Sequence, residues 1–298
     1  MAMDMREQKF GLELEFTGIS RSQAAAVLAK HFGVTAQHFG GSYDKYIVSD
    51  AEGRVWTIMR DSSISPERKD GGCAGDECRC ELVTPICRYS DIETIQEIVR
   101  ELRAAQAVVN SSCGIHVHID GAAFTVQSLK NLLNIVRAHQ DLIYKALDVG
   151  SGRSSYCKKL ESDLVDRAKG AKRMDRLADI WYREDGRRTI HYNDSRYHIV
   201  NLHSYFQNSN IEFRIFNSSL HAGVIKAYIQ FSLAISAQAI NQKFSSSKPI
   251  ETDNDKYAFR CWLLRMGLIG DEFKTCRHHL LKNLSGNSAW RHGNQISA

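Results

Sequence analysis

The chain has 298 residues, of which 43% are hydrophobic and 24% are charged, a composition typical of globular domains that can bury a core. It has no run of about 18 consecutive apolar residues, and its first residues, MAMDMREQKF, lack the apolar core of a signal peptide. We therefore expect no membrane span and a cytoplasmic location. The eight cysteines are too few for a disulfide framework, and the net charge of +5 is mild, which argues against nucleic acid as a partner.

The predicted secondary structure mixes strands and helices without a regular repeat. In chain order we expect a strand at 10–16, a helix from Ser20 to His31, strands at 55–59 and 80–85, a helix begun by a capping box of Ser90 and Glu93, a strand at 114–120, a helix near 125–148, strands at 196–202 and 211–216, and a helix near 220–243. This order favours an α+β fold with an antiparallel sheet over a βαβ repeat.

The domain organisation is read from composition alone. No linker or repeat divides the chain before the polar stretch Ser245–Lys248. We expect one domain over 1–245 and a helical C-terminal extension over 246–298 that packs on it, with a weakly ordered tail beyond Ser285.

Acidic and imidazole side chains gather on one face of two predicted strands. Because side chains alternate along a strand, Glu13 and Glu15 share one face of FGLELEF, and His116 and His118 share one face of GIHVHID. Taken alone, the carboxylates fit a solvated sheet face, and the histidines fit core residues whose hydrogen bonds are satisfied. Two neighbouring carboxylates repel each other unless a cation lies between them.

A third strand repeats the pattern. In NIEFRIFN, Glu212 and Arg214 share one face, which alone would fit a simple ion pair. Three strands with such groups together favour a site for hard divalent cations that bridge phosphate oxygens, with arginines neutralising the remaining charge. Asp61 and Glu81, on neighbouring extended segments, are two further candidate ligands.

These motifs together resemble the amidoligase family, which belongs to the superfamily of glutamine synthetase and glutamate–cysteine ligase. The resemblance covers most of residues 10–240 and runs in order through GLELEF, the aspartate of DSSI, ELVTPI, GIHVHID, RSSYC at 153–157, RYHIVNL at 196–202 and IEFRIFNSSL at 211–220.

The resemblance implies a glutamine-synthetase-like fold, in which a curved antiparallel sheet backed by helices holds ATP and two or three Mg²⁺ or Mn²⁺ ions. Members of the superfamily transfer the γ-phosphate of ATP to a carboxylate, and an amine then captures the acyl phosphate. The domain over 1–245 would be the catalytic domain. The substrates would be small molecules, peptides or proteins, and neither their identity nor the oligomeric state follows from the sequence.

Carried over by motif, the implied roles divide into three kinds. The implied metal ligands are Glu13, Glu15, Asp61, Glu81, His116 and Glu212. His118, Arg196 and Arg214 would approach ATP phosphates, and Arg214, Arg196 and Glu212 would act in phosphoryl transfer. Asn201, Arg153 and Tyr156 would lie on the substrate side. No general base stands out, so an unassigned carboxylate or the acyl phosphate itself remains open.

Alternatives to the ligase come from the same residues and from the cysteines. His116 and His118 with carboxylates would also suit a metal-dependent hydrolase. The surplus of Lys and Arg over 153–188 leaves a non-catalytic nucleotide- or nucleic-acid-binding protein open. Cys73, Cys78 and Cys80 could bind Zn²⁺, although their spacing is not that of a zinc ribbon, and Cys157 is a further candidate nucleophile.

Overall fold

One antiparallel sheet forms the centre of the molecule. The structure is a computed structural model, and it describes residues 2–150, 152–183, 188–190 and 192–290. Within these residues eight strands form a single sheet in the order β2-β3-β4-β5-β1-β6-β8-β7. The strands are β1 (Phe10–Phe16), β2 (Gln37–Gly40), β3 (Lys45–Ser49), β4 (Val55–Met59), β5 (Cys80–Val83), β6 (Gly114–Asp120), β7 (Val200–Asn201) and β8 (Asn210–Asn217).

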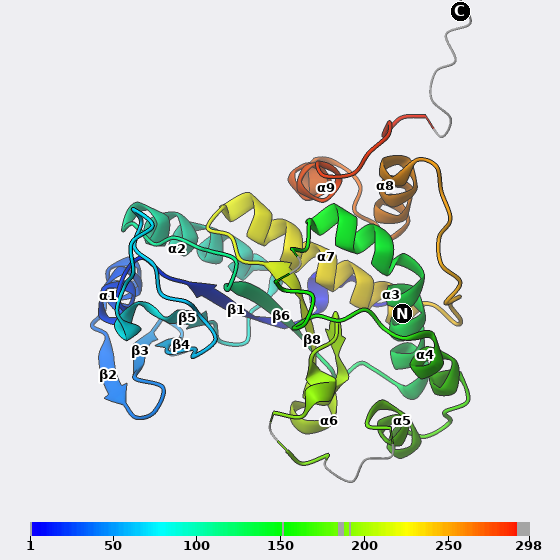
Figure 1. The fold of residues 1–298 in the computed structure, drawn as a ribbon, viewed down its shortest axis with the longest axis horizontal. Helices are drawn as coiled ribbons and strands as arrows, with labels where there is room; N and C mark the ends of the chain where they lie inside the picture. The colour runs from blue at the N-terminus through cyan, green and yellow to red at the C-terminus, as the bar shows by residue number, and fades with distance from the viewer. Residues whose placement is uncertain (1, 151, 184–187, 191, 291–298) are drawn as a thin grey trace, which may run out of the picture.

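Helices cover one face of this sheet. The helices of the described residues are α1 (Arg21–Phe32), α2 (Ile92–Ala104), α3 (Val126–Leu147), α4 (Ser162–Lys169), α5 (Met174–Trp181), α6 (Leu202–Asn208), α7 (Ala222–Asn241), α8 (Asp255–Arg265) and α9 (Lys274–Leu281). Helix α1 packs on β3 and β4, α7 packs on β6, and both α2 and α3 contact α7. The β2–β3 hairpin and α6 project on the other side of the sheet (Figure 1). The fold is therefore α+β, as predicted.

The alternation along β1 explains which face is which. Leu12, Leu14 and Phe16 are almost fully buried against the helices, whereas Glu13 and Glu15 point to the opposite face. Burial of the apolar set fixes the register, because a slip by one residue would turn the carboxylates into the core. The sequence pattern thus determines that the face opposite α1 and α7 carries the polar groups.

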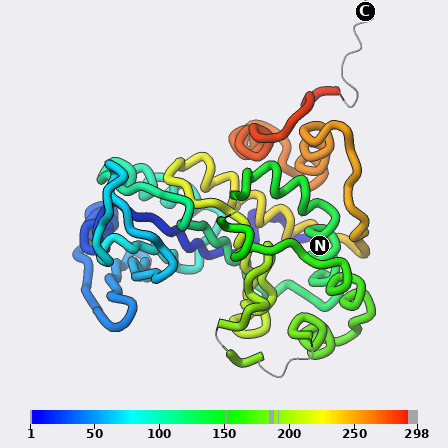
Figure 2. Tube along the Cα trace, viewed as in Figure 1, coloured from blue at the N-terminus to red at the C-terminus, as the bar shows by residue number. Residues whose placement is uncertain are grey.

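Helix α7 lies in the middle of the helical layer (Figure 2). It is long and apolar enough to cross a membrane by length and composition, a property that we did not expect from the sequence. In the structure, however, 78% of its most apolar window is buried inside the protein. A helix that is apolar on all sides is typical of the core of a large domain.

Most predicted elements are confirmed. The strands β1, β4 and β6 have the predicted bounds, β5 ends two residues earlier than expected, and β8 extends the prediction by one residue at each end. The predicted helix from Ser20 to His31 becomes α1, whose N-terminus is closed by a capping box of Ser20 and Gln23.

Two predictions were wrong in their local details, and one element was missed. Residues 196–202 are not one strand, because Asn201 caps a helix by accepting hydrogen bonds from His203 N and Ser204 N, which leaves only the short β7. Ser90 and Glu93 form no capping box, since a short 3₁₀ turn precedes α2 and Asp91 accepts from Arg88 N instead. The hairpin β2–β3 was not predicted.

Two helices lie in the C-terminal segment after Ser245–Lys248. Helix α9 packs on α7, and α8 packs on α9, so both lie outside the helical layer (Figure 1). Of the predicted weakly ordered tail, residues 291–298 lie outside the described residues.

Candidate functional site

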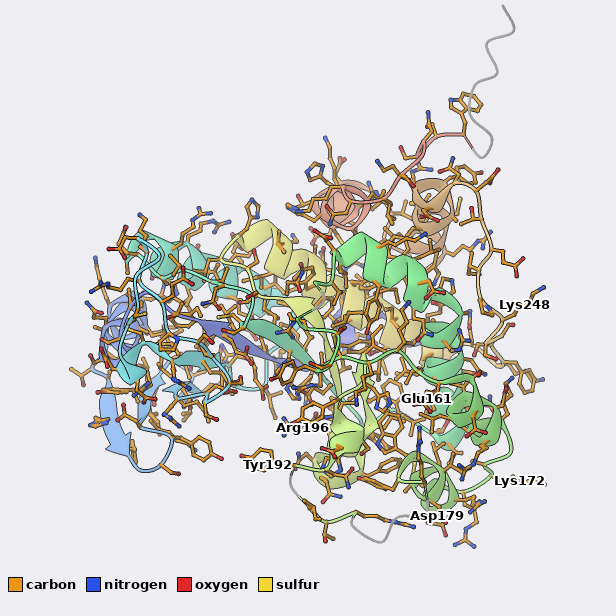
Figure 3. The ribbon with its side chains drawn as sticks, viewed as in Figure 1. Glu161, Lys172, Asp179, Tyr192, Arg196 and Lys248 are labelled. Atoms are coloured by element: carbon orange, nitrogen blue, oxygen red, sulfur yellow. The ribbon has the colours of Figure 1, made fainter. Side chains whose placement is uncertain are left out.

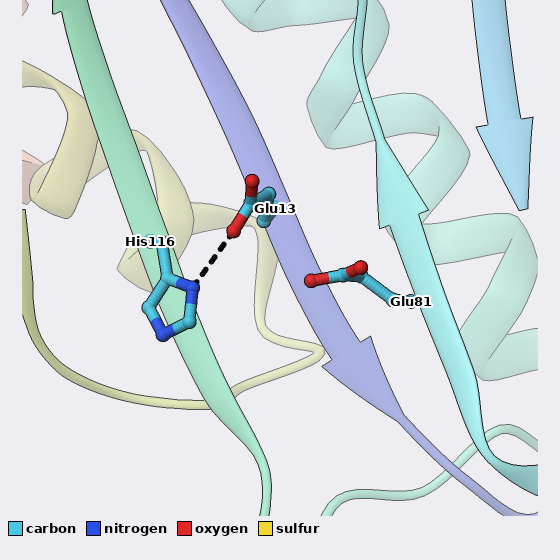
Figure 4. A group of neighbouring side chains, drawn as sticks. All are labelled: Glu13, Glu81 and His116. Atoms are coloured by element: carbon cyan, nitrogen blue, oxygen red, sulfur yellow. Dashed lines mark hydrogen bonds and ion pairs between the residues drawn. The ribbon is translucent and has the colours of Figure 1, made fainter. Parts of the chain in front are cut away.

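Neighbouring strands bring the predicted ligands side by side on the face of the sheet opposite α1 and α7. In the register of the sheet, Glu13 lies opposite His116, Glu15 lies opposite Glu81, and His118 lies opposite Glu212. Figure 4 shows Glu13 between the side chains of His116 and Glu81, each from a different strand. Residues far apart in the sequence therefore form one polar surface.

This surface contains three groups of side chains that could each hold a metal ion. In each group the ligand atoms lie within 4.8 Å of one another. The groups are Glu13, His118 and Glu212; Glu13, Glu81 and His116; and Glu15, Asp61 and Glu81. Because Glu13 and Glu81 each belong to two groups, the groups form a continuous row across the sheet. Carboxylate and imidazole donors fit Mg²⁺ or Mn²⁺.

The two histidines flank Glu13. The Nδ1 atom of His116 lies 2.8 Å from Glu13 Oε2, and the Nε2 atom of His118 lies 3.1 Å from Glu13 Oε1. Burial alone would raise the pKa of Glu13, but His118 and His116 outweigh it and hold this pKa well below its ordinary value. Burial opposes a charge on His118, yet Glu13 and other partners raise the pKa of this imidazole to about 9.

The other end of the row carries an excess of negative charge. Burial and the nearby Asp61 raise the pKa of Glu15 to about 7, although Gly114 N donates a hydrogen bond to this carboxylate. Burial together with Glu13, Glu15 and other carboxylates raises the pKa of Glu81 well above its ordinary value. Carboxylates this close are costly unless a cation lies between them, so the arrangement fits a metal site.

The row opens into a cavity of about 750 Å³. Its lining combines carboxylates and His116 with serines, tyrosines and arginines. Its lining includes Glu13, Glu15, Asp61, Glu81, His116, Ser62, Ser63, Ser65, Ser112, Tyr43, Tyr156, Tyr192, Tyr197, Arg153, Arg196 and Arg214. A cavity of this size suits a small ligand of mixed polar and aromatic character.

Two of the three arginines lie buried against the sheet. Arg214 forms an ion pair with Glu212, and its guanidinium lies 5.9 Å from the centre of the Tyr197 ring. Arg153 donates a hydrogen bond to the carbonyl of Arg214 at 3.2 Å. The Nε atoms of Arg153 and Arg214 are buried and have no hydrogen-bond partner, so both guanidiniums keep donor capacity for an anion.

Tyrosines and Arg196 form the rim of the cavity. The hydroxyl groups of Tyr43 and Tyr192 lie 3.0 Å apart, which links the loop of the β2–β3 hairpin to the segment before β7. Arg196 lies over the ring of Tyr192 at 5.4 Å, and both are labelled in Figure 3. Among the described contacts, the guanidinium of Arg196 stacks on aromatic rings and forms no ion pair.

The predicted residues thus divide into two sets. Nine of the twelve line the cavity, and two more, His118 and Glu212, belong to a metal group without lining it. Asn201 is the exception, because it is 2% exposed and its amide donates to Glu212 Oε2 while its oxygen caps α6. Asn201 therefore contacts Glu212 and does not line the cavity, and its place on the substrate side stays a prediction.

The cysteines do not form the zinc site that we considered. Cys73 is exposed, whereas Cys80 is buried and donates to Ile19 O at 3.3 Å. Within the described residues, each group that could hold a metal consists of carboxylates and histidines, without Cys78 or the other thiols. Burial raises the pKa of the Cys157 thiol, which donates to Arg153 O, so this cysteine is not set up as a nucleophile.

Several residues of the site were not predicted from the sequence. Tyr197 follows Arg196 directly, so its proximity to that arginine was a usable signal. Tyr43 and Tyr192 belong to segments in which no motif marks them. Ser204 and Asn210 lie behind His118, where Ser204 Oγ donates to Asn210 Oδ1 at 2.7 Å. Asn210 stands directly before the IEFRIF motif.

Curated proteins and solved structures add little to the identification of this chain. No curated protein matches the chain. A solved structure of a bifunctional glutathione synthetase from Pasteurella multocida matches 94% of this chain and 47% of its own, with 13% sequence identity and a TM-score of 0.45. This chain thus spans about half the length of that protein, and a TM-score this low adds no argument about fold or function.

The sequence also matches a family model, and this match covers most of the chain. The model is described as "Putative amidoligase enzyme" and aligns with residues 6–236. The aligned region contains each of the metal groups and the residues that line the cavity. The chain belongs to this amidoligase family.

Proposed function

We propose that the chain is an ATP-dependent carboxylate–amine ligase of the glutamine synthetase and glutamate–cysteine ligase superfamily, which forms an amide through an acyl phosphate. The observation that carries this proposal is the continuous row of three carboxylate and imidazole groups beside three arginines in one cavity. Transfer of phosphate between two anions needs this combination of cation sites and guanidiniums.

The residues of each group would hold one cation. Glu15, Asp61 and Glu81 would hold one Mg²⁺ or Mn²⁺, and Glu13 would be shared between the other two. When bound, such ions neutralise phosphate oxygens and orient them for in-line transfer. The donor set fits hard cations, because the two carboxylates with raised pKa values, Glu15 and Glu81, become stable anions once a cation lies between them.

Activation of the acid explains the need for ATP. A carboxylate is a poor electrophile because oxide would have to leave from its carbon. In the first step, a carboxylate oxygen of the acid would attack the γ-phosphorus of ATP, and ADP would leave. The amine would then attack the acyl carbon, lose a proton and release phosphate. In this scheme Arg214 lies where negative charge develops on the transferring group, and it is held there by Glu212.

Tyrosines and arginines of the cavity would bind the substrates. Arg153, Arg196 and Tyr156 line it, and they could pair with a carboxylate and stack on a planar group. The acid would be an amino acid, a peptide or a protein. The chain would work in a reducing compartment such as the cytoplasm, which suits its eight free cysteines.

The proposal is tested by phosphate release from purified protein with ATP, Mg²⁺ and crossed sets of acids and amines. We expect release only when both an acid and an amine are present, together with a product lighter than the two substrates by one water in mass spectrometry. Glu15→Gln and Arg214→Ala should each lower the rate by about 100-fold or more. Glu97→Gln and Arg100→Ala, exposed on α2 behind the sheet, are the matched controls.

The outcomes separate this function from its rivals. Hydrolysis of an amide without ATP would favour a metal-dependent hydrolase built on His116 and His118. Magnesium-dependent binding of an ATP analogue without turnover, lost in Arg214→Ala, would favour a non-catalytic nucleotide-binding protein. Retention of nucleotide binding in both Glu15→Gln and Arg214→Ala would contradict the assigned site.

A further inference from the structure

The short helix α6 connects β7 to β8 next to one of the metal groups. Its capping residue Asn201 contacts one ligand of that group, Glu212, and Asn210, at the start of β8, contacts a second, His118. Asn201 caps α6 and donates to Glu212 Oε2, so both ends of this amide are already used. Ser204, in the first turn, donates to Asn210 Oδ1 at 2.7 Å. The connection is thus built around the group of Glu13, His118 and Glu212.

Asn210 in turn contacts the imidazole of His118. Its Oδ1 atom lies 2.9 Å from His118 Nδ1. A histidine that binds a metal ion is a neutral imidazole. Because an amide oxygen only accepts hydrogen bonds, the proton of His118 in that form would lie on Nδ1, and its lone pair on Nε2. Ser204 occupies the second lone pair of the same oxygen and orients the amide. The tautomer of the neutral His118 is therefore fixed by Asn210, which lies on the same face of the sheet.

The other nitrogen of His118 is left without a hydrogen bond. Nε2 is buried, and although it lies 3.1 Å from Glu13 Oε1, it is an unsatisfied polar atom. Buried nitrogen atoms without a hydrogen-bond partner are rare in proteins unless a bound ligand contacts them. Since Nε2 faces the two carboxylates of its group, a cation is the ligand that satisfies all three.

We propose that Asn210 and Ser204 are positioning residues that hold His118 in the Nδ1–H tautomer, so that Nε2 binds the cation shared with Glu13 and Glu212. This inference rests on the proposed function, because it needs a metal at that group. Partners that orient a metal-bound histidine also raise its basicity, and their loss typically costs about 10–100-fold in metal affinity.

The backbone around Asn210 is held so that this contact is reproducible. Ser209, directly before it, has a left-handed backbone with φ of 57°. The carbonyl of Ser209 accepts from Gly121 N at 2.9 Å, which ties the end of α6 to the end of β6. Asn210 therefore enters β8 at a fixed place beside His118, where it pairs with Asp120 of β6.

The test measures Mn²⁺ binding to the full chain by electron paramagnetic resonance after removal of metals. Wild type should bind Mn²⁺ at more than one site. Asn210→Ala should weaken one of these sites by about 10–100-fold and leave the others unchanged. Asn210→Asp keeps an acceptor for Nδ1–H and should retain wild-type binding, and Ser204→Ala should give a smaller loss. Asn208→Ala, exposed on the same helix, is the matched control.

A second readout reports the tautomer directly. In the Mg²⁺-saturated protein with ¹⁵N-labelled histidine, the signal of His118, assigned with His118→Gln, should show a proton on Nδ1. A proton on Nε2, or equal Mn²⁺ affinities for wild type, Asn210→Ala and Ser204→Ala, would overturn the inference while leaving the ligase proposal in place. Absence of Mn²⁺ binding by wild type would overturn both.

Discussion

Among single residues, Glu15 and Glu81 determine how the metal-free chain responds to pH. Both carboxyls are buried next to other carboxylates, and the pKa of Glu15 is raised to about 7. A raised pKa in the folded state contributes stability that is present below the ordinary value and is lost as the pH rises through the folded value. For Glu15 this contribution is at most about 3 kcal/mol.

The resulting prediction concerns the window from pH 5 to pH 7.5. With a chelator present, the free energy of unfolding should fall across this window, and Mg²⁺ or Mn²⁺ should restore it at pH 7.5, because a cation neutralises the newly formed charge. Denaturant unfolding at each pH measures this. Glu15→Gln should flatten the pH dependence and reduce the metal effect. A rise in stability with pH in the chelated wild type would contradict the prediction.

A carboxylate whose pKa is lowered titrates outside the window from pH 5 to pH 7.5. The pKa of Glu212 falls to about 2, because Arg214 and the two histidines outweigh the effect of burial. The stability that this carboxylate contributes is present above its ordinary pKa and is lost only as the pH falls through 2. The two kinds of carboxylate in one site can therefore be separated by pH.

Among the elements, the turn from α6 into β8 controls the geometry of the site most directly. A Cβ atom added at Gly121 would lie 2.4 Å from the backbone oxygen of Ser209 and 2.8 Å from the ring of Tyr205. A backbone oxygen cannot swing away as a flexible side chain can, so the whole turn would have to move.

We predict that Gly121→Ala lowers the free energy of unfolding by about 1–3 kcal/mol. The control is Gly11→Ala on β1, where the added Cβ would make an ordinary contact of 3.8 Å with His118 Cβ. Glycine costs about 0.5–1 kcal/mol in a strand relative to alanine, so the control should be neutral or slightly stabilising. Urea unfolding of both variants decides this, and an equal effect of the two substitutions would refute the close approach.

The hairpin β2–β3 is a second element that the site depends on. Its loop carries Tyr43, whose carbonyl accepts from Arg60 N at 2.8 Å. The next residue, Asp44, accepts from the buried Arg21, which also donates to carbonyls of the cysteine-containing loop at Asp76 and Arg79. The tyrosine rim is thus anchored to the body of the sheet.

For the molecule as a whole, α7 connects the sheet to the C-terminal helices. Phe231 is 1% exposed and contacts the rings of Phe259 and Trp262 on α8. Phe231 lies before Ser245–Lys248 and both of these ring partners lie after it, so the C-terminal segment completes the core around α7. The predicted division at residue 245 remains a prediction, but the two parts share this contact.

We predict that Phe231→Ala lowers the free energy of unfolding by about 3–5 kcal/mol, because it removes a buried ring and leaves a cavity. Phe244→Ala is the matched control, since this phenylalanine is 72% exposed and should change stability by no more than about 0.5 kcal/mol. Thermal and denaturant unfolding of the two variants measure the difference. A small effect at Phe231 would show that the C-terminal helices do not complete the core.

Much of the site could be predicted because strand geometry is local. Alternation along 10–16, 114–120 and 211–216 determines that Glu13, His116 and Glu212 leave the apolar face, whatever the partners of each strand. The same holds for the strands themselves, since the apolar set of each one is buried on the helical side. The order of the motifs was sufficient to identify the family.

The tertiary structure alone decided which of these groups meet. Register, not spacing, places Glu15 opposite Glu81, and the fold brings Asp61 to the same group. The contacts of Asn201 also became clear only in the tertiary structure, because a capping side chain and a substrate-binding side chain look the same in a motif. Contacts between distant segments, such as Tyr43 with Tyr192, follow from how the chain closes in space, and no local pattern encodes that.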